Sequence, residues 1–195
     1  MASVKDKIKG GFDLILLFGK GIKPFAENPT KEAALKSMWI PIVLYPIAPL
    51  VAWFYPPIGM HEGGFAYSQI FLNVTAFYIL SFVVTAGMVW LFGYWLKQTD
   101  GFWLWLQAHN WVAIPMLIVS LPIAAAMIFD WMPREELDRI SVIVTMYSFL
   151  VGACIVFRSY KINWELAGSL ACMSLFANQQ VWNLLYRIQD IPLVW

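Results

Sequence analysis

The side chains best suited to bind a polar ligand stand inside long apolar runs of the sequence. The candidates are His109, Asn110, Asn178, Gln179, Gln180 and Asn183. An amide that is removed from water needs a hydrogen-bond partner, so these side chains either bond to neighbouring helices or line a polar cavity for a headgroup or small solute. We favour bonding between helices, with Asn73 and Thr75 as the expected partners of the amide cluster. His109 is expected to be a hydrogen-bonded interfacial residue, because proton relays usually join several acids within the membrane.

Catalytic and metal chemistry are not indicated. The sequence contains no GxSxG, HExxH, phosphate-loop or GxGxxG motif. The acids Glu135, Glu136 and Asp138 are read as the solvated first turn of a helix, where negative charge is favoured. Cys154 and Cys172 lie in apolar runs without a CxxC spacing, which is typical of small core residues. We therefore predict no enzymatic activity, no catalytic residue, no metal site and no cofactor.

The elements that must position these side chains are membrane helices. Of the 195 residues, 61% are hydrophobic and only 13% are charged, whereas a soluble domain has about 25% charged residues. The net charge of +1 argues against a nucleic-acid partner, which would need a strongly basic patch. Five uncharged runs are near the roughly 20 residues that span a bilayer, and each is expected to be a transmembrane helix: 37–55, 70–96, 110–129, 140–157 and 166–186. The predicted fold class is an all-α, polytopic membrane helix bundle.

Residues 1–36, here called the N-terminal segment, are basic and form a unit distinct from the transmembrane domain of residues 37–195. Val4, Ile8, Phe12 and Ile15 recur at helical spacing, which predicts an amphipathic helix. This helix either lies in the interface of the bilayer, attracted by anionic lipid, or packs on the protein's own inner face. The pattern fits both alternatives.

The distribution of basic residues predicts the orientation. Ten of the thirteen Lys and Arg residues fall on the side of the N-terminal segment, and such an excess marks the cytoplasmic side. The N-terminus is then cytoplasmic and the C-terminus lies on the opposite side. This topology separates His61 from His109 by about 30 Å of bilayer, so one chain cannot hold a haem between its two histidines.

Residues 97–122 connect the second and third spans. The Thr-Asp-Gly sequence at 99–101 predicts a turn. The Trp-rich stretch after it is expected to be a short helix in the headgroup layer, where Trp is enriched. Pro115 and Pro122 then predict a kinked third span. Three further prolines predict that the first span is bent and covered by neighbours, because its freed carbonyls need partners in lipid.

A set of loose motifs points to a known family. It comprises Asn28-Pro29 before the first span, Gly101-Phe102 in the predicted turn, Ala108 and Pro115 entering the third span, and basic residues between spans four and five. Over about residues 25–186 this pattern resembles the Yip-domain family of five-span membrane proteins. The resemblance implies an integral membrane protein without catalytic residues. Eukaryotic members are linked to vesicle traffic and small GTPases; because this chain lacks their long cytoplasmic N-terminal region, a bacterial inner membrane is expected.

We therefore expect a non-enzymatic scaffold or accessory subunit of a membrane assembly. Its partners would be the lipid bilayer and other integral membrane proteins, or further copies of itself. The alternative is a small transporter or lipid-handling protein that uses the kinked first and third spans and the amides of the fifth.

Overall fold

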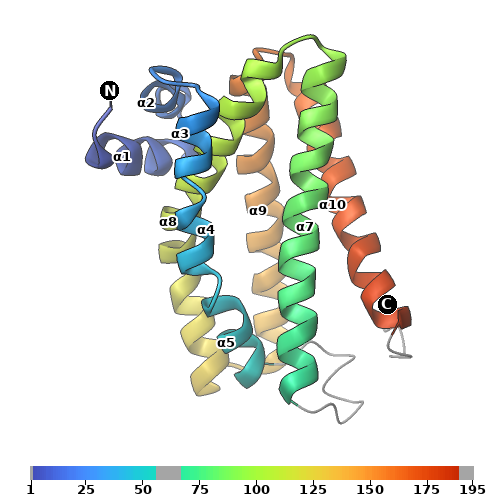
Figure 1. Cartoon of the computed structure of the whole chain (residues 1–195). Coiled ribbons are helices and arrows are strands. Elements are labelled where there is room, and N and C mark those ends of the chain that lie inside the picture. The colour runs from blue at the N-terminus through green and yellow to red at the C-terminus, as the bar shows by residue number, and fades with distance from the viewer. Residues whose placement is uncertain (1, 56–66, 189–195) are drawn as a thin grey trace.

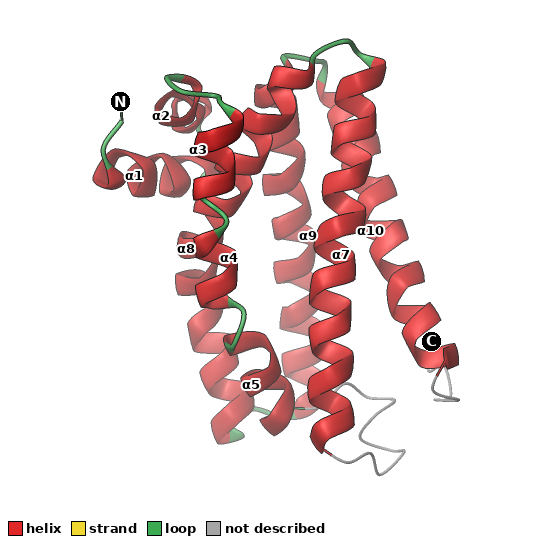
Figure 2. Ribbon diagram, in the orientation of Figure 1, coloured by secondary structure: helices red, strands yellow, loops and turns green. Residues whose placement is uncertain are grey.

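The computed structural model describes residues 2–55 and 67–188, and within them every regular element is a helix (Figures 1 and 2). His61 lies outside the described residues. The helices are α1 (Val4–Ile15), η1 (Gly19–Ile22), α2 (Lys23–Ala26), α3 (Lys31–Lys36), α4 (Trp39–Leu44), α5 (Ile47–Phe54), α7 (Tyr67–Trp95), α8 (Thr99–Phe129), α9 (Arg134–Tyr160) and α10 (Trp164–Ile188).

The four longest helices form a closed ring. Helix α8 packs against α7 on one side and α9 on the other, and α10 closes the ring by contacting both α9 and α7. A broken rod made of α3, α4 and α5 runs along the outside of α8 and reaches α7 through α5 (Figure 1). This arrangement leaves the interior of the ring to be filled by side chains from every helix.

Four stretches are long and apolar enough to cross a membrane: Lys31–Phe54, Tyr67–Trp95, Thr99–Phe129 and Arg134–Tyr160. They are compatible with a multi-pass membrane protein. Helix α10 has 25 residues, but its amides lower its hydropathy and it is not among the four. The predicted fifth span at 166–186 is therefore observed as a helix, and its insertion in the membrane remains a prediction.

The predicted turn at residues 99–101 is wrong. Helix α8 begins at Thr99 and continues without interruption for 31 residues. The chain reverses earlier, where Lys97 adopts a left-handed conformation (φ 56°) and the amide of Gln98 donates to the carbonyl of Gly93 (2.8 Å). The expected separate headgroup helix is therefore the first part of α8.

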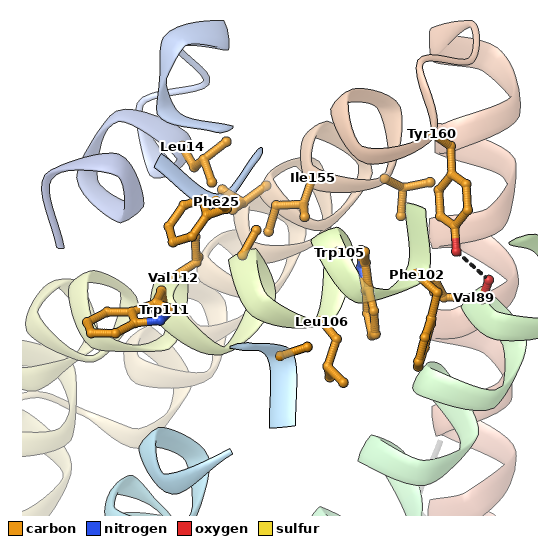
Figure 3. Close-up of a cluster of buried hydrophobic side chains, with 14 of the residues drawn as sticks. Leu14, Phe25, Val89, Phe102, Trp105, Leu106, Trp111, Val112, Ile155 and Tyr160 are labelled. Atoms are coloured by element: carbon orange, nitrogen blue, oxygen red, sulfur yellow. Dashed lines mark hydrogen bonds between the residues drawn. The ribbon is translucent and has the colours of Figure 1, made fainter. Parts of the chain in front are cut away.

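Two Trp residues in the first part of α8 pack in the hydrophobic core of the protein and not at its surface. Trp105 and Trp111 are only 2% and 4% exposed. They belong to a cluster that also includes Leu14 and Phe25 of the N-terminal segment and Ile155 of α9 (Figure 3). The bilayer-interface prediction fails for these two Trp residues because both are buried among side chains of the protein.

The first span is bent, as its prolines predict. It is broken at Ser37 and again at Tyr45. The Ser37 carbonyl, freed by Pro41, accepts from the amide of Ile40 (3.1 Å), and the Tyr45 carbonyl accepts from the amide of Ala48 (3.1 Å). Tight turns of this 3₁₀ type therefore satisfy two of the carbonyls that the prolines leave free.

Helix α1 packs on the protein, which was one of the two alternatives for the N-terminal segment. A capping box at Ser3 begins it, and the Ser3 hydroxyl and backbone amide, donating to the Asp6 carboxylate, hold the pKa of Asp6 below its usual value. Gly11 faces α8, where an added Cβ would lie 3.1 Å from the Trp111 carbonyl oxygen and 3.3 Å from Pro115 Cγ. The helix thus covers the carbonyl that Pro115 leaves without an amide donor.

A buried tyrosine joins three of the long helices at the same end of the bundle. Tyr160 of α9 is fully buried, and its hydroxyl donates to the Val89 carbonyl of α7 (2.9 Å; Figure 3). Its ring lies against two glycines: an added Cβ at Gly101 would be 2.5 Å from Tyr160 Cδ1, and one at Gly93 would be 2.7 Å from the hydroxyl oxygen. These glycines form the slot that the ring occupies.

Candidate functional site

A partly open cavity of about 360 Å³ lies between the helices of the ring. Most of its lining is apolar and comes from α4 and all four long helices. Polar groups line it as well: Tyr78, Ser81, Thr85, His109, Asn110, Thr145, Ser148, Ser174 and Asn178. No Asp, Glu, Lys or Arg is among the lining residues in the described part of the chain. The cavity is therefore uncharged, apolar in its walls and polar at selected points.

Helix geometry explains why Asn110 and Asn178 line the same cavity. Asn110 is eleven residues into α8 and Asn178 is fourteen residues into α10, which at 1.5 Å per residue places them about 16 and 21 Å from the helix starts. Both helices start at the same end of the bundle (Figure 1). The two amides therefore lie at similar depth near the middle of the bundle.

Asn110 is held by a defined hydrogen-bond chain. Its Nδ2 donates to Ser37 Oγ (2.8 Å) and approaches Met38 Sδ (3.4 Å), and the Ser37 hydroxyl donates to the carbonyl of Ala34 (2.6 Å). Since the Ser37 proton is committed to Ala34, the Asn110 amide must present its NH₂ group to Ser37. Asn110 is 1% exposed, and its Oδ1 has no partner.

Asn178 is arranged in the same way on the other side of the cavity. Its Nδ2 donates to Thr85 Oγ1 of α7 (3.2 Å), and its Oδ1 is buried without a partner. The expected pairing with Thr75 is wrong, because the Thr75 hydroxyl accepts from Tyr45 and donates to the carbonyl of Phe71. A third oxygen at the cavity, Ser81 Oγ, is likewise buried and unpaired.

His109 lies at the wall of the cavity and packs as an aromatic ring. It stacks on Trp105, with ring centroids 5.0 Å apart and planes 19° apart, and faces Phe82 at 6.3 Å. No hydrogen bond of His109 is found among the described residues, so the expectation of a hydrogen-bonded interfacial histidine is not met.

The remaining candidates do not reach the cavity. Gln179 Nε2 donates to Asn183 Oδ1 one turn further along α10 (3.2 Å), and Asn183 is buried. This hydrogen bond joins two residues of the same helix. The sequence missed the contribution of Ser81 and Thr85 as cavity residues, although their spacing of four places both on one face of a helix.

A second space of similar openness lies beside the cavity. It is a groove of about 310 Å³ between α4 and α7, lined almost wholly by apolar atoms. Pro41, Tyr78 and Phe82 line both the cavity and this groove. The Tyr78 hydroxyl donates to the Pro41 carbonyl (3.3 Å), so this hydrogen bond joins two of the three residues that line both spaces.

Metal binding has no support in the described residues, where no group of three or more His, Cys, Asp or Glu side chains could hold an ion. Comparisons with family models, with curated proteins and with solved structures find no match to this chain. The cavity and the groove beside it are therefore the features from which a function can be argued.

Proposed function

We propose that this chain is a non-enzymatic, multi-pass membrane protein that holds an amphiphilic molecule in the cavity between its helices. This is the lipid-handling alternative of the sequence analysis. The observation that carries it is the set of unpaired buried oxygens on Ser81, Asn110 and Asn178 inside an apolar bundle. A buried acceptor left without a donor costs about 1–3 kcal/mol, and a bound polar headgroup supplies donors.

The shape of the site agrees with this proposal. Ligand pockets are typically about 300–1,000 Å³, largely apolar, with a few placed polar groups. The cavity of about 360 Å³ meets that description, and the apolar groove adjoins it at Pro41, Tyr78 and Phe82. Exposed apolar side chains on α7, α9 and α10 suit lipid and other membrane proteins equally, so they do not favour the scaffold role. The proposal does not depend on membership of the Yip-domain family.

A cavity-filling substitution tests the proposal. Gly152 of α9 lines the cavity, and a Cβ added there meets no atom within 4 Å. Gly168 of α10 has equally open surroundings but does not line the cavity. In protein extracted directly into polymer discs, we expect Gly152→Phe to lose a co-purifying amphiphile that wild type and Gly168→Phe retain, as read by native mass spectrometry.

The outcome that contradicts the proposal is equally clear. If wild type carries no small molecule and takes up none from added lipids, or if Gly152→Phe is occupied as fully as Gly168→Phe, the cavity is not a ligand site.

We also propose that α10 is the fifth span and that the N-terminus is cytoplasmic. In support, the N-terminal segment lies at the same end of the bundle as the α7–α8 and α9–α10 connections (Figure 1), which carry Lys97 and Lys161. In a background without Cys154 and Cys172, a membrane-impermeant maleimide applied to spheroplasts should label Arg187→Cys, and should label Ser3→Cys only after lysis. Labelling of both from the same side contradicts five crossings.

A further inference from the structure

We infer that the ligand of the cavity is an uncharged amphiphile whose head carries at least two hydrogen-bond donors, and that it enters sideways from the lipid between α4 and α7. The inference rests on the proposed function and specifies its ligand class and route. Three observations support it: the absence of charged residues from the described lining of the cavity, the hydrogen bonding of the two amides, and the groove that adjoins the cavity.

The lining selects against charge. Its described residues include no acid, lysine or arginine to neutralise an ionic head. An unpaired charge in an apolar interior is far more costly than an unpaired polar group. His109 does not change this conclusion. Its ring packs against the rings of Trp105 and Phe82, and it forms no ion pair with a described residue. A carboxylate, phosphate or ammonium head would therefore be disfavoured.

The amides select for donors. Both Asn110 and Asn178 give their NH₂ groups to protein hydroxyls, Ser37 at 2.8 Å and Thr85 at 3.2 Å. The carbonyl oxygen of each amide has no partner. A carbonyl oxygen can only accept a hydrogen bond, so a head made of ether or ester oxygens gains nothing there. Hydroxyl or neutral N–H groups on the ligand are the complement of these two oxygens.

The groove selects for an apolar tail and gives it a path. Its lining between α4 and α7 is almost free of polar surface, and it shares Pro41, Tyr78 and Phe82 with the cavity. A head in the cavity and a hydrocarbon tail in the groove would be continuous across these three residues. The Tyr78–Pro41 hydrogen bond (3.3 Å) is at the weak end of the normal range. Breaking it to let a hydrocarbon tail pass would therefore cost little free energy.

A panel of amphiphiles with one tail tests the head chemistry. We compare monooleoylglycerol, its 2,3-dimethyl ether and oleic acid, each added to wild-type protein in polymer discs and read by native mass spectrometry. One buried hydrogen bond to an otherwise unpaired group changes affinity by about tenfold. We expect the diol to bind at least about tenfold more tightly than the diether, and the acid at neutral pH to bind more weakly than the diol.

The panel separates the two hypotheses. Equal binding of the diol and the diether, or tighter binding of the ionised acid, overturns the donor-head inference while the amphiphile proposal stands. Failure of every amphiphile to bind overturns the proposed function itself.

A matched pair of variants tests the route. Ile79 lines the groove and is 55% exposed, whereas Ile143 of α9 is 67% exposed and lines neither space. We expect Ile79→Trp to slow uptake of monooleoylglycerol at least about tenfold with its affinity within twofold of wild type, and Ile143→Trp to leave both unchanged. Equal uptake rates for the two variants overturn sideways entry.

Discussion

Replacement of Gly101 by Leu is expected to cause the largest loss of stability of any single substitution considered. The Cβ alone would lie 2.5 Å from Tyr160 Cδ1 and 3.2 Å from the Ser159 carbonyl oxygen. The ring cannot yield by a small rotation, because Gly93 and Val89 hold its other end. Tyr160 must therefore leave its slot, and expelling a fully buried aromatic side chain costs about 3–5 kcal/mol. We expect the midpoint of thermal aggregation to fall by about 10 °C or more.

The matched control is Gly87→Leu. Gly87 is in the interior of α7, and a Cβ there meets nothing within 4 Å. This variant should be as stable as wild type or more stable, because glycine in a helix interior is less favourable than leucine by up to about 1 kcal/mol. A double substitution gives the decisive result: with Tyr160→Ala already present, Gly101→Leu should cost far less. Additive losses would show that the ring is not the cause.

Replacement of Gly21 by Val is expected to detach the N-terminal segment from the bundle. An added Cβ at Gly21 would lie 2.7 Å from both the Gly10 carbonyl oxygen and the Leu14 amide nitrogen. Both contacts are with backbone, which cannot swing aside as a side chain does. Overpacking of this kind costs about 1–3 kcal/mol, which corresponds to a rise of about ten- to hundredfold in the undocked population.

Trypsin cleavage in polymer discs measures that population, since cleavage follows the open fraction when reclosing is fast. Gly19, in the same turn, provides the control: its nearest neighbours are the guanidinium atoms of Arg158, at 2.8 Å from an added Cβ. The long Arg158 side chain can change its rotamer at little cost in free energy. Trypsin should therefore cleave Gly19→Val at close to the wild-type rate. Equal cleavage of the two variants would refute the steric explanation.

The long helices were largely predictable from local sequence. Each of four uncharged runs lies inside a single observed helix, except that the first extends one residue beyond the end of α7: 70–96, 110–129, 140–157 and 166–186. Hydrophobic length is a property of the chain itself, so it needs no knowledge of neighbours. The number of crossings is less certain from the same information, because the amides that lower the hydropathy of α10 gain their partners only in three dimensions.

The beginning of α8 was not predictable in this way. Thr-Asp-Gly is an ordinary turn sequence, yet Gly101 is helical, and the Tyr160 ring packs where a Cβ of residue 101 would lie. That contact joins residues 59 positions apart. The same holds for Trp105, whose burial depends on side chains from distant parts of the chain.

The candidate residues were recognised, but their grouping was not. Asn110 and Asn178 stood out as amides in apolar runs, whereas their shared cavity depends on α8 starting eleven residues before Asn110. The orientation of each amide depends on Ser37 and Thr85, which are 73 and 93 positions away along the chain. Only the assembled bundle shows that both carbonyl oxygens are left free.

The two breaks in the first span have a consequence for the width of the groove. Helix α4 has six residues, and the tight turns at Ser37 and Tyr45 on either side of it lack the regular α-helical ladder. Such 3₁₀ segments commonly act as hinges. The place of α4 beside α7 therefore depends on bonds to neighbouring helices, from Tyr78 to the Pro41 carbonyl and between Tyr45 and Thr75, and these bonds set the width of the groove.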